Sequence, residues 1–133
     1  MFEKITYIMS AIFPDQDLDL SFLIEIADGS TEFLIESIDM FLHHTPELLQ
    51  TINKAIADKD WTITATAAHK LKPNLGFFGM PTSQALIQEI EIMAKTGSPD
   101  PERLKAKFVE VYTIVEANLI TLTKIKAEKA TEL

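Results

Sequence analysis

Apolar residues recur three or four positions apart along most of the chain, and no stretch alternates between apolar and polar with a period of two. A spacing of three and four residues is typical of amphipathic α-helices, because residues at these intervals share one face of a helix that has 3.6 residues per turn. The pattern therefore predicts an all-α protein.

The N-terminal part of the chain carries a short apolar stretch over residues 22–26. Asp19 or Ser21 can cap a short helix there, and the Asp28-Gly29 pair is expected to end it. Leu20, Leu23 and Ile24 are expected to pack in the core; a docking patch for a partner is the alternative interpretation of these three residues.

A second helix is predicted to begin after Ser30, with an apolar stripe that continues past Pro46 to about residue 57. Proline lacks a backbone N–H, so Pro46 either kinks one long helix or begins a separate helix as its first residue. A third helix is predicted after Asp60, a good N-cap. The expected core face of this helix consists of Ile63, Ala67, Ala68, Leu71, Leu75 and Phe78.

Two further helices complete the pattern. One follows Pro81 and ends before the break at residues 97–101; the other runs from Pro101 to about residue 128, roughly 40 Å at 1.5 Å per residue. Four amphipathic helices joined by short turns predict an antiparallel four-helix bundle. We expect one domain over residues 1–133, with the bundle at about residues 30–128 and residues 1–29 as an accessory segment that holds a short helix or helices.

Composition narrows the classes of function. The chain has 12 basic and 20 acidic side chains and a formal net charge of −8, so we expect it to bind neither nucleic acid nor anionic membranes. The absence of cysteine excludes disulfides, cysteine-ligated zinc, iron–sulfur clusters and thiol catalysis. Residues 1–13 lack the basic start and the cleavage pattern of a signal peptide, and no apolar run is long enough to span a membrane. A cytoplasmic protein is therefore expected.

His69 is the candidate reactive side chain. It lies roughly 200° around the third helix from the core residue Leu71, so it is expected to point into solvent. Its neighbours on that face are all short except Lys72: Thr62, Ala65, Thr66, Lys72, Pro73 and Gly76. Such an open platform suits a nucleophile that another macromolecule must reach, whereas large apolar walls would favour a small-molecule pocket. On geometry alone, however, most exposed helix histidines beside lysines are ordinary surface residues.

The adjacent pair His43-His44 suggests a metal site, but neighbouring residues on a helix diverge by about 100°. No His-x-x-x-His spacing accompanies the pair. We therefore expect no metal site in this chain.

A motif surrounds His69. The string Ala68-His69-Lys70-Leu71-Lys72, followed by small residues and by Gly79 ten positions after the histidine, resembles the signature of the histidine-containing phosphotransfer (HPt) domain. The resemblance covers about residues 30–95. Further matching positions in the flanking helices are Phe41, Pro46, Leu48, Leu49, Asp60, Leu86, Ile90 and Glu91.

The resemblance implies a role for each matching residue. His69 would accept and donate a phosphoryl group, and Lys72 would neutralise the phosphoryl charge. Lys70 would add positive charge beside the histidine. Glu91, one helix over, would hydrogen-bond the imidazole and orient it, although a solvated helix face is the other interpretation of that position.

Three further positions bear on access to His69. Gly76 and Gly79 would leave room for a receiver domain to approach, with ordinary helix-end glycines as the alternative. Pro73 departs from the family pattern, which most often has glycine there. Because proline leaves the His69 carbonyl without its helical partner, the helix is expected to bend one turn past the histidine.

The resemblance implies a phosphoryl carrier of a two-component phosphorelay, not an enzyme in its own right. The expected partners are receiver domains of response regulators and a sensor histidine kinase, including hybrid kinases, with Mg²⁺ and the reacting aspartate on the receiver domain. We expect a free-standing monomer without a cofactor of its own. Two other functions stay open: a helical adaptor that binds a partner without phosphorylation, and a small enzyme that uses His69 as a general base.

Overall fold

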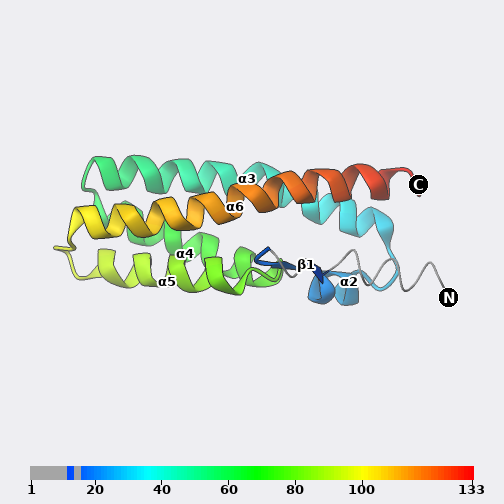
Figure 1. Cartoon of the computed structure of the whole chain (residues 1–133), viewed down its shortest axis with the longest axis horizontal. Helices are drawn as coiled ribbons and strands as arrows, with labels where there is room; N and C mark the ends of the chain where they lie inside the picture. Colours follow the sequence, from blue (N-terminus) through cyan, green and yellow to red (C-terminus); the bar gives the residue numbers. More distant parts are fainter. Residues whose placement is uncertain (1–11, 14–15) are drawn as a thin grey trace.

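A computed structural model of the chain describes residues 12–13 and 16–133. Four long helices form the bundle: α3 (Thr31–Ala57), α4 (Trp61–Phe77), α5 (Pro81–Lys95) and α6 (Pro101–Ala130) (Figure 1). Around the bundle, α4 packs against α3 and α5, and α6 packs against α5 and α3. The predicted all-α, four-helix bundle is therefore confirmed.

The helix ends lie where local sequence chemistry places them. Ser30, Asp60 and Asp100 each accept a hydrogen bond from a backbone N–H two or three residues further on, at the starts of α3, α4 and α6. Pro46 lies inside α3, which continues through it as one helix. Of the two possibilities that the sequence leaves open at this proline, the structure therefore shows the single long helix.

The apolar faces of the four helices meet in one core, but the predicted core face of α4 is not buried throughout. Ile63 is 47% exposed, contrary to the sequence prediction. Its neighbour Thr64 is buried instead, with its hydroxyl donating to the Asp60 carbonyl at 2.8 Å. Because successive helical residues are about 100° apart, burial of Thr64 turns Ile63 outward. Among the residues that the structure describes, the best-buried large side chains are Leu23, Ile38, Leu49, Ile52, Leu71, Leu75, Met80, Ile87, Ile90, Leu104, Val111 and Leu122.

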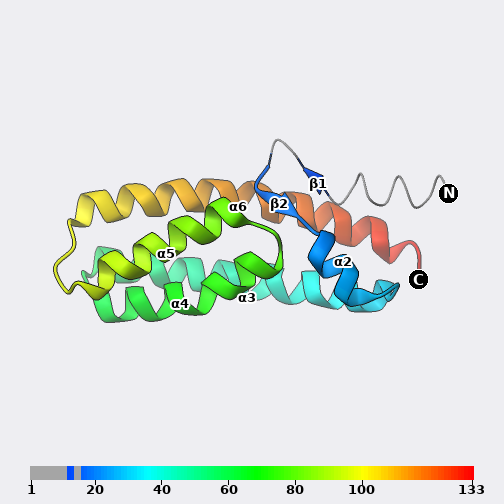
Figure 2. The same ribbon diagram turned by 90° about the horizontal axis from the view of Figure 1, so that it is seen from below.

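The accessory segment packs where α3 and α6 extend beyond the α4–α5 hairpin (Figures 1 and 2). It contributes α2 (Ser21–Ala27) and two very short strands, β1 (Ile12–Phe13) and β2 (Leu18–Asp19), which pair antiparallel. The strands were not anticipated, because two residues are too few to show a period-two pattern. Leu20 and Leu23 are buried, as the core interpretation predicts. Apart from β1, the stretch tested for a signal peptide, residues 1–13, lies outside the described residues.

The start of α2 differs in detail from the prediction. Its N-cap is Leu20, whose side chain makes no capping hydrogen bond. Asp19 acts from one position earlier: its carboxylate accepts hydrogen bonds from both the backbone N–H and the hydroxyl of Ser21, at 3.0 and 2.6 Å. The aspartate therefore orders this turn without being the cap itself.

A long-range contact fixes the accessory segment to the bundle. The Asp17 carboxylate accepts hydrogen bonds from the backbone N–H groups of Thr82 (2.9 Å) and Ser83 (2.7 Å), in the first turn of α5. Asn118 of α6 donates to the Asp17 carbonyl at 2.8 Å. A residue more than sixty positions away thus supplies the cap that Met80, the local N-cap, cannot provide.

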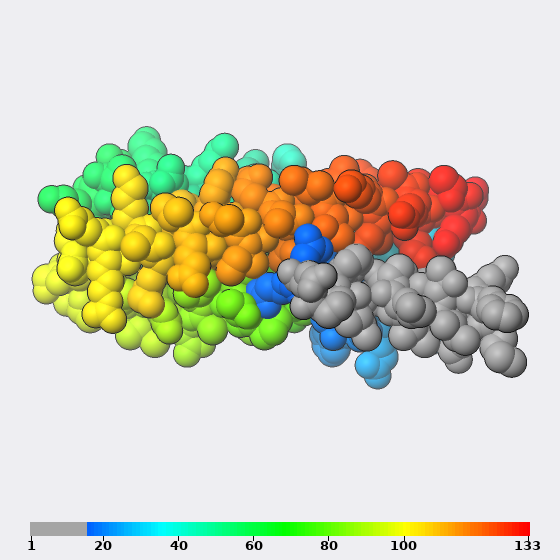
Figure 3. All heavy atoms as spheres, viewed as in Figure 1, coloured from blue at the N-terminus to red at the C-terminus, as the bar shows by residue number. Residues whose placement is uncertain are grey.

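The last helix, α6, spans the length of the face seen in Figure 3, between the edges of α3 and α5. It ends at Ala130, two residues beyond the predicted end. None of the helices in the described part of the chain combines the length and the apolar character that crossing a membrane would require.

Candidate functional site

The position of His69 follows from the packing of α4. Ala68 and Leu71 of this helix are both fully buried, which turns the intervening histidine away from the core. The His69 side chain is 68% exposed. The geometric prediction that it points into solvent agrees with this exposure.

Glu91 reaches His69 from the neighbouring helix α5. Its side chain is only 3% exposed, and its Oε2 lies 2.8 Å from His69 Nδ1. An ionised carboxylate can only accept a hydrogen bond, so Nδ1 carries the proton and donates it to Glu91. In the neutral imidazole the other nitrogen, Nε2, then holds the lone pair of a nucleophile.

Two lysines share the same carboxylate. Lys72, one turn after His69 on α4, donates from Nζ to Glu91 Oε1 at 2.9 Å. Lys95, one turn after Glu91 on α5, lies with its Nζ 3.0 Å from Glu91 Oε2. Lys95 was not predicted from the sequence, although the four-residue spacing between Glu91 and Lys95 is typical of ion pairs on one helix.

These contacts determine the charge of Glu91. The hydrogen bond from Lys72, followed by those from Lys95 and His69, outweighs the effect of burial and lowers the pKa of Glu91 from 4.5 to about 2. The carboxylate is therefore ionised at any pH near neutrality. One carboxylate and two ammonium groups leave one excess positive charge beside the imidazole, on a chain whose formal net charge is −8.

Lys70 takes no part in this cluster. It is exposed on α4 and lies about 100° around the helix from His69, while the two ammonium groups on Glu91 belong to Lys72 and Lys95. Lys95, which was not identified from the sequence, brings a second ammonium group to Glu91, and a contribution of Lys70 to the charge beside His69 stays a prediction.

The two glycines near the site are in contact with the chain itself. At Gly76, a Cβ atom would lie 2.5 Å from the side-chain nitrogen of Gln84, which donates to the Lys72 carbonyl. At Gly79, which has a φ of +65°, a Cβ atom would collide with the backbone carbonyl of Asp19. The accessory segment therefore fills the space that a Cβ atom at position 79 would need, and the clearance that Gly76 and Gly79 would give a receiver domain stays a prediction.

Pro73 lies within α4, which continues to Phe77. The proline is exposed one turn after His69, on the open side of the helix. Its compact ring leaves the histidine accessible; its effect on the tilt of the imidazole stays a prediction.

The cluster of His69, Glu91, Lys72 and Lys95 is suited to anions. Both oxygens of the only carboxylate in this cluster are already bound by cationic or N–H donors, so a divalent cation would have to displace an ammonium group to bind there. A nucleophilic nitrogen flanked by two ammonium groups can instead receive and stabilise a phosphoryl group.

Comparisons with known proteins agree with this geometry. Residues 36–120, more than half of the chain, match the family model described as "Hpt domain". Among solved structures, the chain is similar to the HPT domain of an Hpt sensor hybrid histidine kinase from Shewanella, with a TM-score of 0.59 and 27% sequence identity. That match covers 88% of this chain and 93% of the Shewanella chain. None of the curated proteins compared with the chain matches it.

The motif around His69, the helical bundle and these matches agree, and the fold and family inferred from the sequence are confirmed. The chain belongs to the Hpt domain family and serves histidine phosphotransfer in a two-component phosphorelay.

Proposed function

We propose that Nε2 of His69 is the atom that carries the phosphoryl group. The observation that supports this assignment is the 2.8 Å hydrogen bond from Nδ1 to the buried Glu91 carboxylate, because it orients the ring and leaves the lone pair on the exposed nitrogen. In the transfer step, Nε2 attacks the phosphorus of an aspartyl phosphate. The N–P bond forms as the O–P bond breaks, and the aspartate leaves as a carboxylate.

Lys72 and Lys95 stabilise the phosphoryl group once it is on His69. Their side chains are 27% and 62% exposed, so each can shift from Glu91 toward a phosphoryl oxygen without a change of fold. The transferred group carries charge on three oxygens throughout the step, and nearby cations lower the energy of that charge. Lys72, the more buried of the two, makes the stronger contribution.

The remaining chemistry belongs to the partner. Two-component partners such as receiver domains and kinases fit a family member of this kind. A receiver domain supplies the aspartate and the Mg²⁺, since the carboxylate beside His69 is already bound by two lysines. The chain acts as a monomeric carrier in the cytoplasm, and the reverse step returns the phosphoryl group to another receiver domain.

The test is transfer of a radioactive phosphoryl group from a phosphorylated receiver domain. The wild-type chain should acquire label that is labile in acid and stable in alkali, as a phosphoramidate is. His69→Gln should acquire none, while His44→Gln, which removes another exposed histidine, should be labelled as the wild type is. Label on His69→Gln would overturn the assignment. If no cognate receiver labels the wild type, the adaptor function replaces the proposal.

A further inference from the structure

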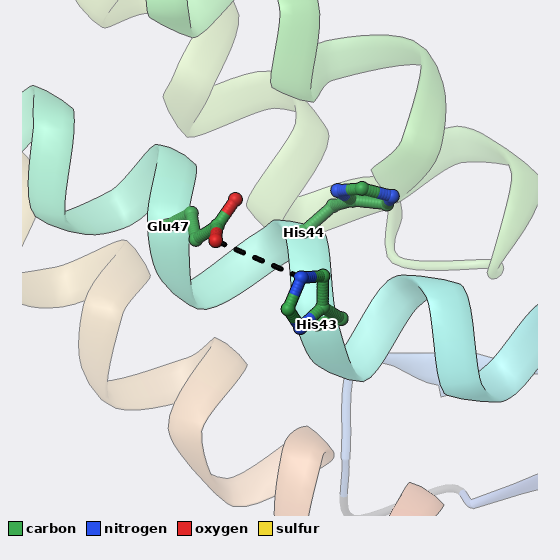
Figure 4. A group of neighbouring side chains, drawn as sticks. All are labelled: His43, His44 and Glu47. Atoms are coloured by element: carbon green, nitrogen blue, oxygen red, sulfur yellow. Dashed lines mark ion pairs between the residues drawn. The ribbon is translucent and has the colours of Figure 1, made fainter.

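A second group of side chains with ligand chemistry lies on α3, outside the phosphotransfer site. It consists of His43, His44 and Glu47, all three exposed (Figure 4). Taking the direction of His43 on the helix as zero, His44 lies at about 100° and Glu47, four residues on, at about 40°. Glu47 therefore leaves the helix one turn further along, in a direction between those of the two histidines.

The ligand atoms of the three residues are already close together. His43 Nε2 is 3.7 Å from Glu47 Oε1, and one possible ligand atom from each of the three residues lies within 4.8 Å of the others. Metal–ligand bonds of about 2.1 Å would bring such atoms to about 3.4 Å from one another. The required movement is small, and the side chains of His43 and Glu47 are 72% and 65% exposed, so most of each side chain is free of packing that would oppose rotation.

The charged side chains next to this cluster, Asp39 and Lys126, are paired with each other and do not occupy His43, His44 or Glu47. Asp39, one turn before His43 on α3, is bound to Lys126 of α6 at 2.6 Å. It therefore does not compete as a fourth ligand, and its carboxylate keeps Lys126 occupied. The remaining coordination positions of a metal ion on this face would be filled by water.

The donor set decides which ions fit. Two neutral imidazoles and one carboxylate suit borderline transition metals, whereas Mg²⁺ and Ca²⁺ prefer oxygen ligands alone. We propose that His43, His44 and Glu47 form a surface binding site for a divalent transition-metal ion of the Zn²⁺, Ni²⁺ or Cu²⁺ class. The sequence pattern predicted no metal site, because adjacent histidines diverge on a helix and no His-x-x-x-His spacing accompanies them; Glu47 was not recognised as a third ligand.

The place of the site on α3 gives binding a structural consequence. Pro46 lies between the ligands and cannot donate the helical hydrogen bond to the Leu42 carbonyl. A metal ion bound by both His43 and Glu47 spans the same turn. It would therefore stabilise the helix where the backbone hydrogen bond to Leu42 is missing. His44 also lines a groove with Asn74 and Phe77 of α4, which brings the ion close to the helix that carries His69.

The proposal is tested with tag-free protein and Zn²⁺ alone, by competition with a chromophoric chelator. The wild type should bind one Zn²⁺ per chain, and its melting temperature should rise with Zn²⁺ concentration. His43→Gln, His44→Gln and Glu47→Gln should each weaken binding by at least about tenfold. With Cu²⁺, electron paramagnetic resonance should show two nitrogen ligands in the wild type and one in His44→Gln.

Two matched controls distinguish binding at these three side chains from binding through surface charge or through His69. Glu36→Gln removes the same charge from α3 two turns before His43, and His69→Gln removes the remaining histidine; both should bind Zn²⁺ as the wild type does. The proposal is overturned if Glu36→Gln weakens binding as much as Glu47→Gln, since charge alone would then account for the loss. Loss of binding in His69→Gln, or no saturable binding by the wild type, would also overturn it.

Discussion

The Glu91 carboxylate is almost completely buried, yet it accepts hydrogen bonds from one imidazole and two ammonium groups. A buried charge without partners would be strongly unfavourable. Here the imidazole and the two ammonium groups offset the loss of hydration. The carboxylate, held in place by these contacts, orients His69. The same interaction therefore contributes both to stability and to the geometry of the nucleophile.

This dual role predicts a pH dependence of stability. The pKa of Glu91 falls from 4.5 to about 2 on folding, so its ion pairs stabilise the fold above pH 4.5 and are lost as the pH falls from about 4.5 to about 2. The free energy involved is on the order of 3 kcal/mol. Urea denaturation across this range should show a steeper loss of stability for the wild type than for Glu91→Gln, which has no charge to lose.

Glu89→Gln provides the control for this experiment. Glu89 lies on the same helix with a half-exposed side chain paired to Lys107, so its replacement should leave the steep acid dependence in place. Equal slopes for the wild type and Glu91→Gln would contradict the importance of the buried carboxylate.

The three lysines near His69 should differ in their effect on transfer. Lys72→Ala should slow phosphotransfer most, and Lys95→Ala by several-fold to about tenfold, which corresponds to about 1 kcal/mol. Lys70→Ala should have the smallest effect, because Lys70 does not reach the cluster. Rapid-quench measurements with one receiver domain at low and high salt check this order, and the effect of Lys95→Ala should shrink as salt screens its exposed charge. An effect of Lys70→Ala as large as that of Lys95→Ala would be inconsistent with the geometry.

At the residue scale, sequence motifs identified His69, Lys72 and Glu91 and missed Lys95. The motif lies mainly within one helix, where spacing along the chain decides which residues are neighbours. Lys95 lies near His69 only because both side chains contact Glu91 and because α5 packs against α4. Its pairing with Glu91 could have been predicted from their four-residue spacing; its distance from the histidine could not.

At the scale of the elements, the glycine in the turn between α4 and α5 is required by contact with a segment distant in the sequence as well as by the turn itself. Gly79 and Gly97 both follow a helix end and both have a positive φ, of 65° and 82°. Only at Gly79 does the backbone of another segment, at Asp19, fill the space that a Cβ atom would need. The Asp19 N–H also donates to the Gly79 carbonyl at 2.9 Å, so the two segments are held in direct contact.

Alanine substitutions at the two glycines should therefore have unequal effects. Gly97→Ala should destabilise the protein by about 1–2 kcal/mol through the left-handed backbone alone. Gly79→Ala should cost about 1–3 kcal/mol more, because the accessory segment must also move. Chemical denaturation of both variants measures the difference. Equal losses would show that the Asp19 contact does not contribute.

Most element boundaries could be predicted from the sequence, since Ser30, Asp60, Asp100 and the helix-ending glycines act on their own neighbours. Pro46 could not be interpreted uniquely, because proline is compatible with either a kinked helix or a new one. The structure retains one helix there, and α3 packs against both α4 and α6.

For the molecule as a whole, the residues of α4 that stabilise the core and the histidine that serves phosphotransfer lie on opposite sides of the helix. Leu71→Ala should lower the free energy of unfolding by about 2–5 kcal/mol, because Leu71 is fully buried. His69→Gln, two residues away, should change it by less than about 1 kcal/mol, since the side chain is largely exposed. Thermal and urea denaturation check both values. A large destabilisation by His69→Gln would show that loss of transfer in that variant reflects unfolding.

The sequence by itself determined the all-α class, the number of long helices, the outward direction of His69 and the family. Each of these depends on periodicity or on a local motif, which the chain carries without reference to its neighbours in space. Only the tertiary structure decided that Asp17 caps α5, that Asp19 occupies the space beside Gly79 and that Lys95 joins Glu91 at the histidine. These contacts depend on how the helices and the accessory segment pack, and helical periodicity identifies a buried face without specifying which segment covers it.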